Sequence, residues 1–209
     1  MIPYRKDSPL RMHYLWSLRE DTAVGWDAEG RTLVLSGPQG MERIEDPTTA
    51  VAETLHRMEL GPIRLANLLG PKDGAASGAE AYTLVLSVLR EISHLVIRTL
   101  SLEDLKGPVL SVVPAGPAAR FTLVRLPAQR SVRLRPNVTI TLEGNVFLLE
   151  CRALDHRVQI HRPEAMWVVS LLAWPTTPDA LIQVLPIPAE LTLEILGHLA
   201  GAGMTVSGG

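Results

Sequence analysis

The residue types that could bind a metal or attack a substrate are few and scattered along this chain. The six histidines show no metal-ligand spacing, and His156 and His161, five residues apart, would point to opposite faces of one strand. Cys151 alternates with Phe147 and Leu149, which favours a buried thiol over a nucleophile. These residues therefore predict neither a metal site nor a nucleophilic catalyst.

Two further motifs could bind phosphate or exchange protons. The glycine-rich stretch 36–40 precedes a predicted strand, so it lacks the helix N-terminus that a phosphate site uses. Glu42, Glu45 and Asp46 could act as paired carboxylates, but a solvated strand end followed by a helix N-cap at Asp46 explains them more simply. We therefore expect no catalysis by this chain alone.

Composition limits the class of protein. The chain has 209 residues and a net charge of -2, so no overall basic field would attract nucleic acid or an anionic membrane. The longest apolar run, from Ala165 to Trp174, is far shorter than the roughly 20 residues that span a bilayer. One cysteine and no visible signal peptide indicate a cytoplasmic protein.

The first half predicts strands followed by helices. Residues 23–37 have the pattern of a β-hairpin, and residues 41–44 that of a short strand. Pro47 opens a predicted helix that Gly61 and Pro62 end. A short helix over 63–69 and a long one over 80–100 follow, the long one with a continuous apolar face.

The second half repeats this order. Residues 131–163 predict a meander of three strands with a turn at 143–145, and Pro163 opens a helix that ends before Trp174 and Pro175. Two further helices are expected over 178–184 and 188–202. The proline-rich stretch between the halves alternates apolar residues, so we expect an extended, packed connector.

The predicted fold is therefore α+β, with two tandem winged-helix-like units, each a three-stranded antiparallel sheet followed by three helices. The expected boundaries are 1–106 for the first unit, 107–130 for the connector and 131–209 for the second unit.

This layout resembles the N-terminal half of SagB-type azoline dehydrogenases, which act on ribosomally made, modified peptides. The stretches that carry the resemblance are YLWSLREDTAVGWDAEGRTLVLSGPQG, GPVLSVVP and VRLRPNVTITLEGNVFLLECRALDHRVQIHRP, with TPDALIQVLP and LGHLAGAGM near the end. It implies a pair of peptide-recognition elements that bind a precursor leader peptide. In that family a domain that binds FMN follows, so FMN is expected in a partner chain or in a domain beyond this sequence.

The strand-and-helix order, together with the arginines near the edge expected at 155–161, indicates where a peptide would bind. An extended peptide is expected to add a strand to the third strand of one unit and to place side chains in the cleft beside the third helix. In the second unit the expected contacts are Arg157, Val158, Gln159, Ile160 and His161 on the strand, with Leu193, Leu196 and His198 on the helix. In the first unit they are Met41 and Arg43 within an edge at 39–44, with Tyr82, Leu86 and Leu89 as the wall.

Charge leaves two interpretations of the second half open. Residues 120–162 hold eight arginines, whereas no lysine or arginine follows Arg162. The arginines could be a solvated face, or they could guide an acidic peptide to the sheet. Two other functions remain as alternatives: a structural or dimerisation subunit of the flavin enzyme, and a winged-helix DNA-binding protein. The helix over 189–202 has no basic residue, which argues against DNA binding.

Overall fold

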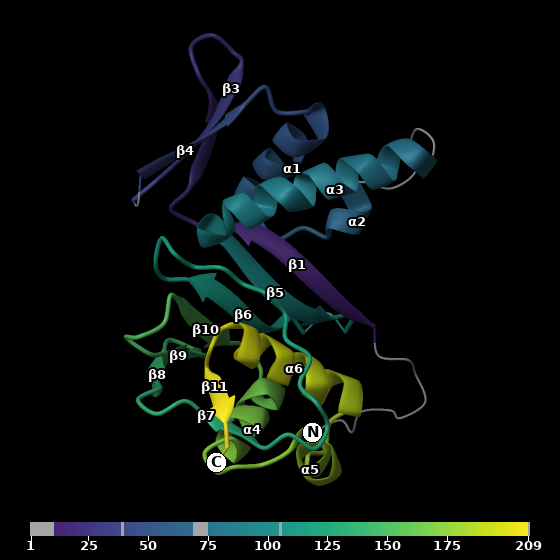
Figure 1. Cartoon of the computed structure of the whole chain (residues 1–209), viewed down its shortest axis with the longest axis vertical. Helices are drawn as coiled ribbons and strands as arrows, with labels where there is room; N and C mark the ends of the chain where they lie inside the picture. The colour runs from purple at the N-terminus through teal and green to yellow at the C-terminus, as the bar shows by residue number, and fades with distance from the viewer. Residues whose placement is uncertain (1–10, 39, 69–74, 105, 209) are drawn as a thin grey trace.

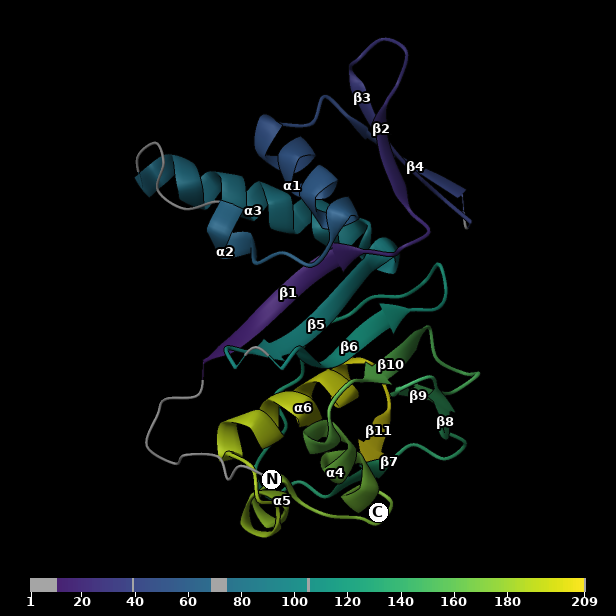
Figure 2. The ribbon, with the colours of Figure 1, turned by 180° about the vertical axis from the view of Figure 1, so that it is seen from behind.

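The computed structural model describes residues 11–38, 40–68, 75–104 and 106–208. It confirms an α+β fold whose sheets are antiparallel. A six-stranded sheet crosses the middle of the molecule, with the helices of the first half at one end and those of the second half at the other (Figures 1 and 2).

The first half contains one long strand, a small sheet and three helices. The elements are β1 (Met12–Leu18), β2 (Ala23–Trp26), β3 (Thr32–Gly37), β4 (Gly40–Glu45), α1 (Thr49–Leu60), α2 (Leu65–Leu68) and α3 (Ala75–Glu91). β2, β3 and β4 form a separate sheet in that order, as the predicted hairpin requires. We use "first unit" for β2–β4 with α1–α3.

The second half repeats the order of three strands and three helices. After β5 (Val96–Leu102) and β6 (Pro108–Pro114) come β7 (Val132–Leu134), β8 (Thr139–Glu143), β9 (Val146–Glu150), β10 (His156–Ile160), α4 (Pro163–Leu171), α5 (Pro178–Val184), α6 (Ala189–Gly201) and β11 (Thr205–Ser207). The predicted meander and all three predicted helices are present. We use "second unit" for β8–β10 with α4–α6.

The six-stranded sheet joins the two halves. Its order is β1-β5-β6-β10-β9-β8, so strands from the first half and from the predicted connector continue the sheet of the second unit. Two cores form on the two sets of helices. One surrounds Leu35, Leu55 and Met58, and the other surrounds Ile160 and Ile195. Each fully buried side chain of this size contributes about 1.5–3 kcal/mol.

The long helix predicted over 80–100 is wrong at its C-terminal end. α3 ends at Glu91, and residues 96–102 form β5, which pairs with β1 on one side and β6 on the other. The apolar spacing of a helix happens to continue into this strand. The β-branched residues Val96, Ile97 and Thr99 favour the strand, and pairing on both sides stabilises it.

The first helix begins later than predicted. Its N-cap is Thr48, whose hydroxyl accepts a hydrogen bond from the Val51 amide at 3.4 Å. Asp46 instead adopts a positive φ of 44°, in a turn between β4 and the helix. Pro47 therefore stands before the N-cap and not at the first helical position.

Candidate functional site

β4 is an edge strand of the small sheet. Its only strand partner in the described chain is β3. The Asp46 amide continues that ladder by donating to the Arg31 carbonyl, so the even-numbered residues of β4 face β3. The backbone groups of Met41, Arg43 and Glu45 therefore face outward, where another strand could pair with them.

The side chains of β4 alternate between the helices and solvent. Ile44 and Glu42 stand opposite the buried Leu33 and Leu35, so they lie on the helical face of the sheet. Glu42 approaches His94, just after α3, with 3.2 Å between Oε1 and Nε2. Met41 and Arg43, predicted to contact a peptide, therefore offer their backbone to the edge and their side chains to the opposite face.

The helix wall predicted for this unit is only partly available. Leu89 is buried in the core, and Leu86 packs against the same core. Tyr82 is 40% exposed. It lies near Arg98 of β5, and the charge of Tyr82 acts to raise the pKa of Arg98. Tyr82 is thus the member of this predicted set that presents substantial surface.

The prediction of a free edge in the second unit is wrong. β10 pairs with β9 on one side and with β6 on the other, so the strand with Arg157, Val158, Gln159, Ile160 and His161 cannot accept another strand. Val158 and Ile160 are buried in the core. The sequence could not show this, because the strand that covers the edge comes from a segment predicted to be only a connector.

The other face of β10 carries a short polar chain. The hydroxyl of Ser111 on β6 lies 3.0 Å from His161 Nε2 and 2.8 Å from the hydroxyl of Thr99 on β5. Burial lowers the pKa of His161. These contacts satisfy polar groups between three neighbouring strands, and they fix β6 against β10.

The chain itself also covers part of α6. The Val124 amide donates to the Gly197 carbonyl at 3.3 Å, and a Cβ placed on Gly201 would lie 2.4 Å from the Thr122 carbonyl oxygen. Glycines one helical turn apart therefore let residues 122–124 approach the helix closely. Both β10 and α6 are thus covered by segments of the region predicted as a connector.

A cavity of about 350 Å³ remains beside α6. Leu193 and Leu196, predicted to wall a cleft, line it together with Met12, Leu123, Val124, Arg125, Leu126, Glu190, Glu194 and Gly197. A hollow therefore lies beside this helix, as expected from Leu193 and Leu196. The expected free edge of β10 does not adjoin it, because β6 occupies that edge.

His198, the third member of this predicted wall, is buried and is not among the residues that line the cavity. Its Nδ1 donates to the Glu194 carbonyl at 2.7 Å, and its ring stacks on Tyr14 at 6.3 Å between centroids. Burial lowers the pKa of His198 to about 4. It is therefore neutral at pH 7 and packs as part of the core.

A cation at the junction of the two halves was missed by the sequence analysis. The Arg98 guanidinium lies 3.1 Å from the ring centroid of Trp16 and 5.5 Å from that of Phe121. Burial lowers the pKa of Arg98 to about 9, against the opposing influence of Tyr82. Because residue 98 was predicted to lie in a helix, its contacts with Trp16 and Phe121 could not be predicted from the sequence.

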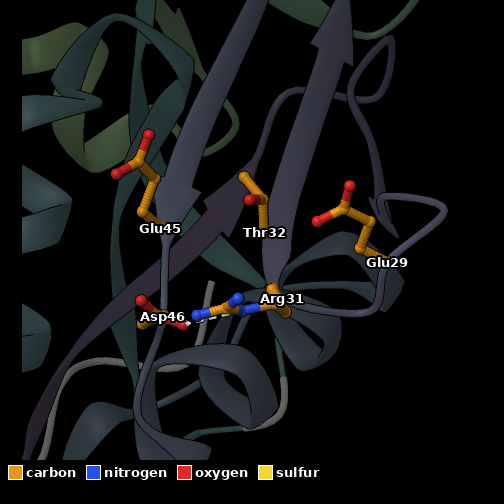
Figure 3. Close-up of a pocket in the computed structure, with 5 residues that line it drawn as sticks. All are labelled: Glu29, Arg31, Thr32, Glu45 and Asp46. Carbon is orange, nitrogen blue, oxygen red and sulfur yellow. Dashed lines mark ion pairs between the residues drawn. The ribbon is translucent and has the colours of Figure 1, made fainter.

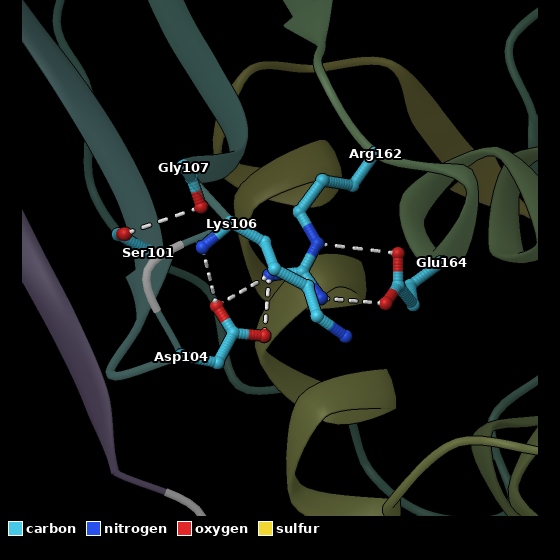
Figure 4. Close-up of polar contacts among 6 residues, drawn as sticks. All are labelled: Ser101, Asp104, Lys106, Gly107, Arg162 and Glu164. Carbon is cyan, nitrogen blue, oxygen red and sulfur yellow. Dashed lines mark hydrogen bonds and ion pairs between the residues drawn. The ribbon is translucent and has the colours of Figure 1, made fainter. Parts of the chain in front are cut away.

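Two of the arginines of the second half, Arg157 and Arg162, are held within the fold. Arg162 is only 6% exposed and binds both Asp104 and Glu164 (Figure 4). Burial lowers its pKa, but the hydrogen bonds to Glu164 and Asp104 outweigh burial and raise the pKa overall. Arg157 is half-buried, and its charge acts on Asp21 near β1. Both arginines therefore have roles within the fold.

The acidic residues around β4 form a shallow, polar hollow. Glu29, Arg31, Thr32, Glu45 and Asp46 line it, and the Arg31 guanidinium lies 3.9 Å from the Asp46 carboxylate (Figure 3). Both partners of this ion pair are mostly exposed, so the contact contributes little. Glu45 and Asp46 thus lie at a solvated strand end, as predicted, whereas Asp46 is not the helix N-cap and Glu42 approaches His94.

Within the described ranges, no three His, Cys, Asp or Glu side chains gather as a metal site would require. Cys151 is buried, as its strand pattern predicted. Among the same residues, no helix is both long and apolar enough to cross a bilayer. Neither a family model nor a curated protein matches this chain.

Proposed function

We propose that this chain binds an extended peptide by strand addition at the outer edge of β4. One comparison within the molecule supports this most strongly. In the second unit, the third strand, β10, already has an added antiparallel strand, β6, contributed by the same chain. In the first unit, the equivalent strand β4 has no such partner in the described chain. The outer edge of β4 is therefore the equivalent of the edge of β10 that β6 occupies.

The internal example suggests the direction and side-chain pattern of the peptide. Because β6 runs antiparallel to β10, the peptide would run antiparallel to β4. Leu110 and Val112 of β6 turn into the core and are almost fully buried. Alternate peptide residues would likewise face Glu42 and Ile44, and the others would lie beside Met41 and Arg43.

Backbone pairing alone would give weak binding. Three outward residues offer six backbone groups, and a hydrogen bond contributes a net 1 kcal/mol or so, which makes roughly 6 kcal/mol in all. Association costs about 4–15 kcal/mol before any net affinity appears. Side-chain contacts on the two faces of the strand must therefore supply most of the affinity and the specificity.

The peptide that we propose is the leader region of a ribosomally made precursor. The basis is the resemblance to SagB-type azoline dehydrogenases, together with the strand-and-helix order of both units. In this proposal the chain presents the precursor to a flavin dehydrogenase, with FMN bound outside these residues. The winged-helix-like description of the two units belongs to the same proposal.

Replacing Arg43 by proline should weaken leader binding about ten-fold or more, because proline removes an outward N–H and leaves a peptide carbonyl without a partner. Arg43→Ala removes the side chain but keeps the N–H, so it is the matched variant and should bind much more tightly than Arg43→Pro. Fluorescence anisotropy with a labelled leader peptide, from the precursor gene nearest this one, measures both.

Two further variants locate the binding edge. Leu142→Pro alters β8, the outer strand of the six-stranded sheet, and Arg157→Glu alters the second unit. Neither should change leader affinity appreciably. Equal affinity of Arg43→Pro and Arg43→Ala would refute strand addition at β4, and a large loss in Arg157→Glu would move the site to the second unit.

A structural role is the second candidate, favoured by the opposite end of the large sheet. All residues of β8 are exposed, and its Ile140 and Leu142 are 40% and 61% exposed. Phe147 of the neighbouring strand β9 is 38% exposed. An exposed apolar edge strand is suited to pairing with another chain. Sedimentation equilibrium at micromolar concentration tests this role, since a monomer alone would exclude self-pairing at β8.

A further inference from the structure

The two outer edges of the six-stranded sheet differ in what covers them. At one edge, the Trp16 amide donates to the Ile63 carbonyl and the Ile63 amide donates to the Trp16 carbonyl, each at 2.9 Å. The chain itself therefore covers part of β1. At the other edge, β8 pairs only with β9 within the described ranges, and it lies at the margin of the molecule (Figures 1 and 2). One row of backbone groups on β8 consequently faces outward.

The hairpin after β8 determines which backbone groups these are. A two-residue turn joins Glu143 to Val146, so these two residues form the hydrogen-bonded pair that closes the hairpin. Hydrogen-bonded and non-hydrogen-bonded pairs alternate along an antiparallel ladder, so Ile140 and Leu142 do not bond to β9. The N–H and C=O groups of Ile140 and Leu142 are therefore available to another strand.

The side chains of β8 do little to prevent such pairing. Edge strands that stay unpaired are commonly protected by charged residues, prolines or bulges. β4 has three charged residues among its six, whereas β8 has one, Glu143, at its end, and has no proline. Ile140 and Leu142 stand opposite Leu149 and Phe147 in an uninterrupted register, so apolar side chains of both strands share one face of the sheet. β8 thus presents apolar surface together with free backbone groups.

We propose that β8 pairs antiparallel with β8 of a second copy of this chain, about a two-fold axis at Thr141. Ile140 of each copy would then exchange both backbone hydrogen bonds with Leu142 of the other copy, so every outward group of these residues is paired. The proposal gives the structural role of the second candidate one partner, and it rests on that role. It does not depend on strand addition at β4.

The backbone favours this position of the axis over its neighbours. An axis at Ile140 would place Leu142 opposite Val138, whose amide already donates within its own turn. An axis at Leu142 would place Ile140 opposite the first residue of the hairpin turn. Only the axis at Thr141 pairs outward groups of the strand with one another.

The side chains of β8 are complementary to themselves in the same register. Ile140 and Leu142 of the two copies would meet on one face, and the two Thr141 side chains would meet on the other. Glu143 would stand opposite Thr139 of the other copy and not opposite its own symmetry mate, so no like-charged pair forms directly across the interface. This self-complementarity favours a second copy over an unrelated strand.

A cysteine on the axis tests the register. In Thr141→Cys the two Cα atoms would lie about 4.5 Å apart, within the range of a disulfide, so oxidation of the full chain should give a covalent dimer. Thr139→Cys is the matched variant, because four residues of strand would separate its two copies by roughly 14 Å, which is too far for a disulfide. The native chain, whose Cys151 is buried, should not form a covalent dimer.

Sedimentation equilibrium at micromolar concentration tests the edge itself. Leu142→Lys should weaken self-association about ten-fold or more, because its charge would lose water at the interface. Leu60→Lys, at a residue of α1 that is 87% exposed, is the control and should associate like the native chain.

Three results would overturn the proposal: a monomeric native chain, a dimer that Leu142→Lys leaves intact, or equal disulfide yields from Thr139→Cys and Thr141→Cys. The second of these would keep a structural role but move its interface away from β8. No leader peptide is present in these experiments, so none of the three results bears on peptide binding at β4.

Discussion

Replacing Arg162 by alanine should lower the free energy of unfolding by about 3–5 kcal/mol, because it leaves two carboxylates without their cation. Arg162 Nη1 donates to both oxygens of Asp104 at 2.9 and 3.0 Å, and Nη2 donates to Glu164 at 2.7 Å. The Glu164 side chain is 11% exposed. These contacts fasten the turn between β5 and β6 to the start of α4.

Urea denaturation at pH 7 measures this loss, and an exposed ion pair provides the comparison. Arg11 lies 3.5 Å from Glu103, with side chains 72% and 51% exposed. Arg11→Ala should therefore change stability by no more than about 0.5 kcal/mol. If Arg162→Ala cost as little as Arg11→Ala, the buried network would not be what anchors α4 to the sheet.

Lowering the pH from 7 to 4 should destabilise the fold by about 3 kcal/mol through His198. The pKa of His198 is near 6.5 in an unfolded chain and about 4 in the fold, where burial disfavours the charged ring. The unfolded state therefore binds the proton first as the pH falls. Stability is unaffected above pH 6.5 and declines between 6.5 and 4.

His198→Asn isolates this contribution, because an asparagine amide can still donate to the Glu194 carbonyl but does not titrate. Unfolding free energies at pH 7 and pH 4 should differ less in the variant than in the native chain, by about 3 kcal/mol. His56→Asn, on the exposed face of α1, should leave the pH dependence unchanged. The same acid sensitivity in His198→Asn would show that other groups cause it.

Local signals allowed much of the fold to be predicted. The proline that opens α4, the threonine and proline that open α5 and the Gly144 turn all act within a few residues. Helix termini and tight turns depend on backbone conformation and nearby hydrogen bonds, so the sequence contains the needed information. This is why the order of strands and helices in each unit could be predicted.

The errors lie where a distant segment decides. The sequence of β5 continues the helical spacing of α3, but pairing with β1 and β6 makes it a strand. The sequence of β10 has the pattern of an edge strand, but β6 pairs with that edge. The intrinsic preference of a residue for helix or strand is weak compared with the stabilisation that a strand gains from pairing on both sides. For the candidate site, the outward edge at Met41 and Arg43 was predictable from alternation, whereas the contact of Arg98 with Trp16 depends on packing between segments far apart in sequence.

The most direct test of strand addition is amide hydrogen exchange along β4, measured residue by residue with and without the leader peptide. In the free chain, the amides of Glu42 and Ile44 are bonded to β3, whereas those of Met41, Arg43 and Glu45 face outward and should exchange quickly. Bound peptide should slow exchange of these three amides at least ten-fold. A saturated complex in which all three still exchange at their free rates would contradict peptide binding at this edge.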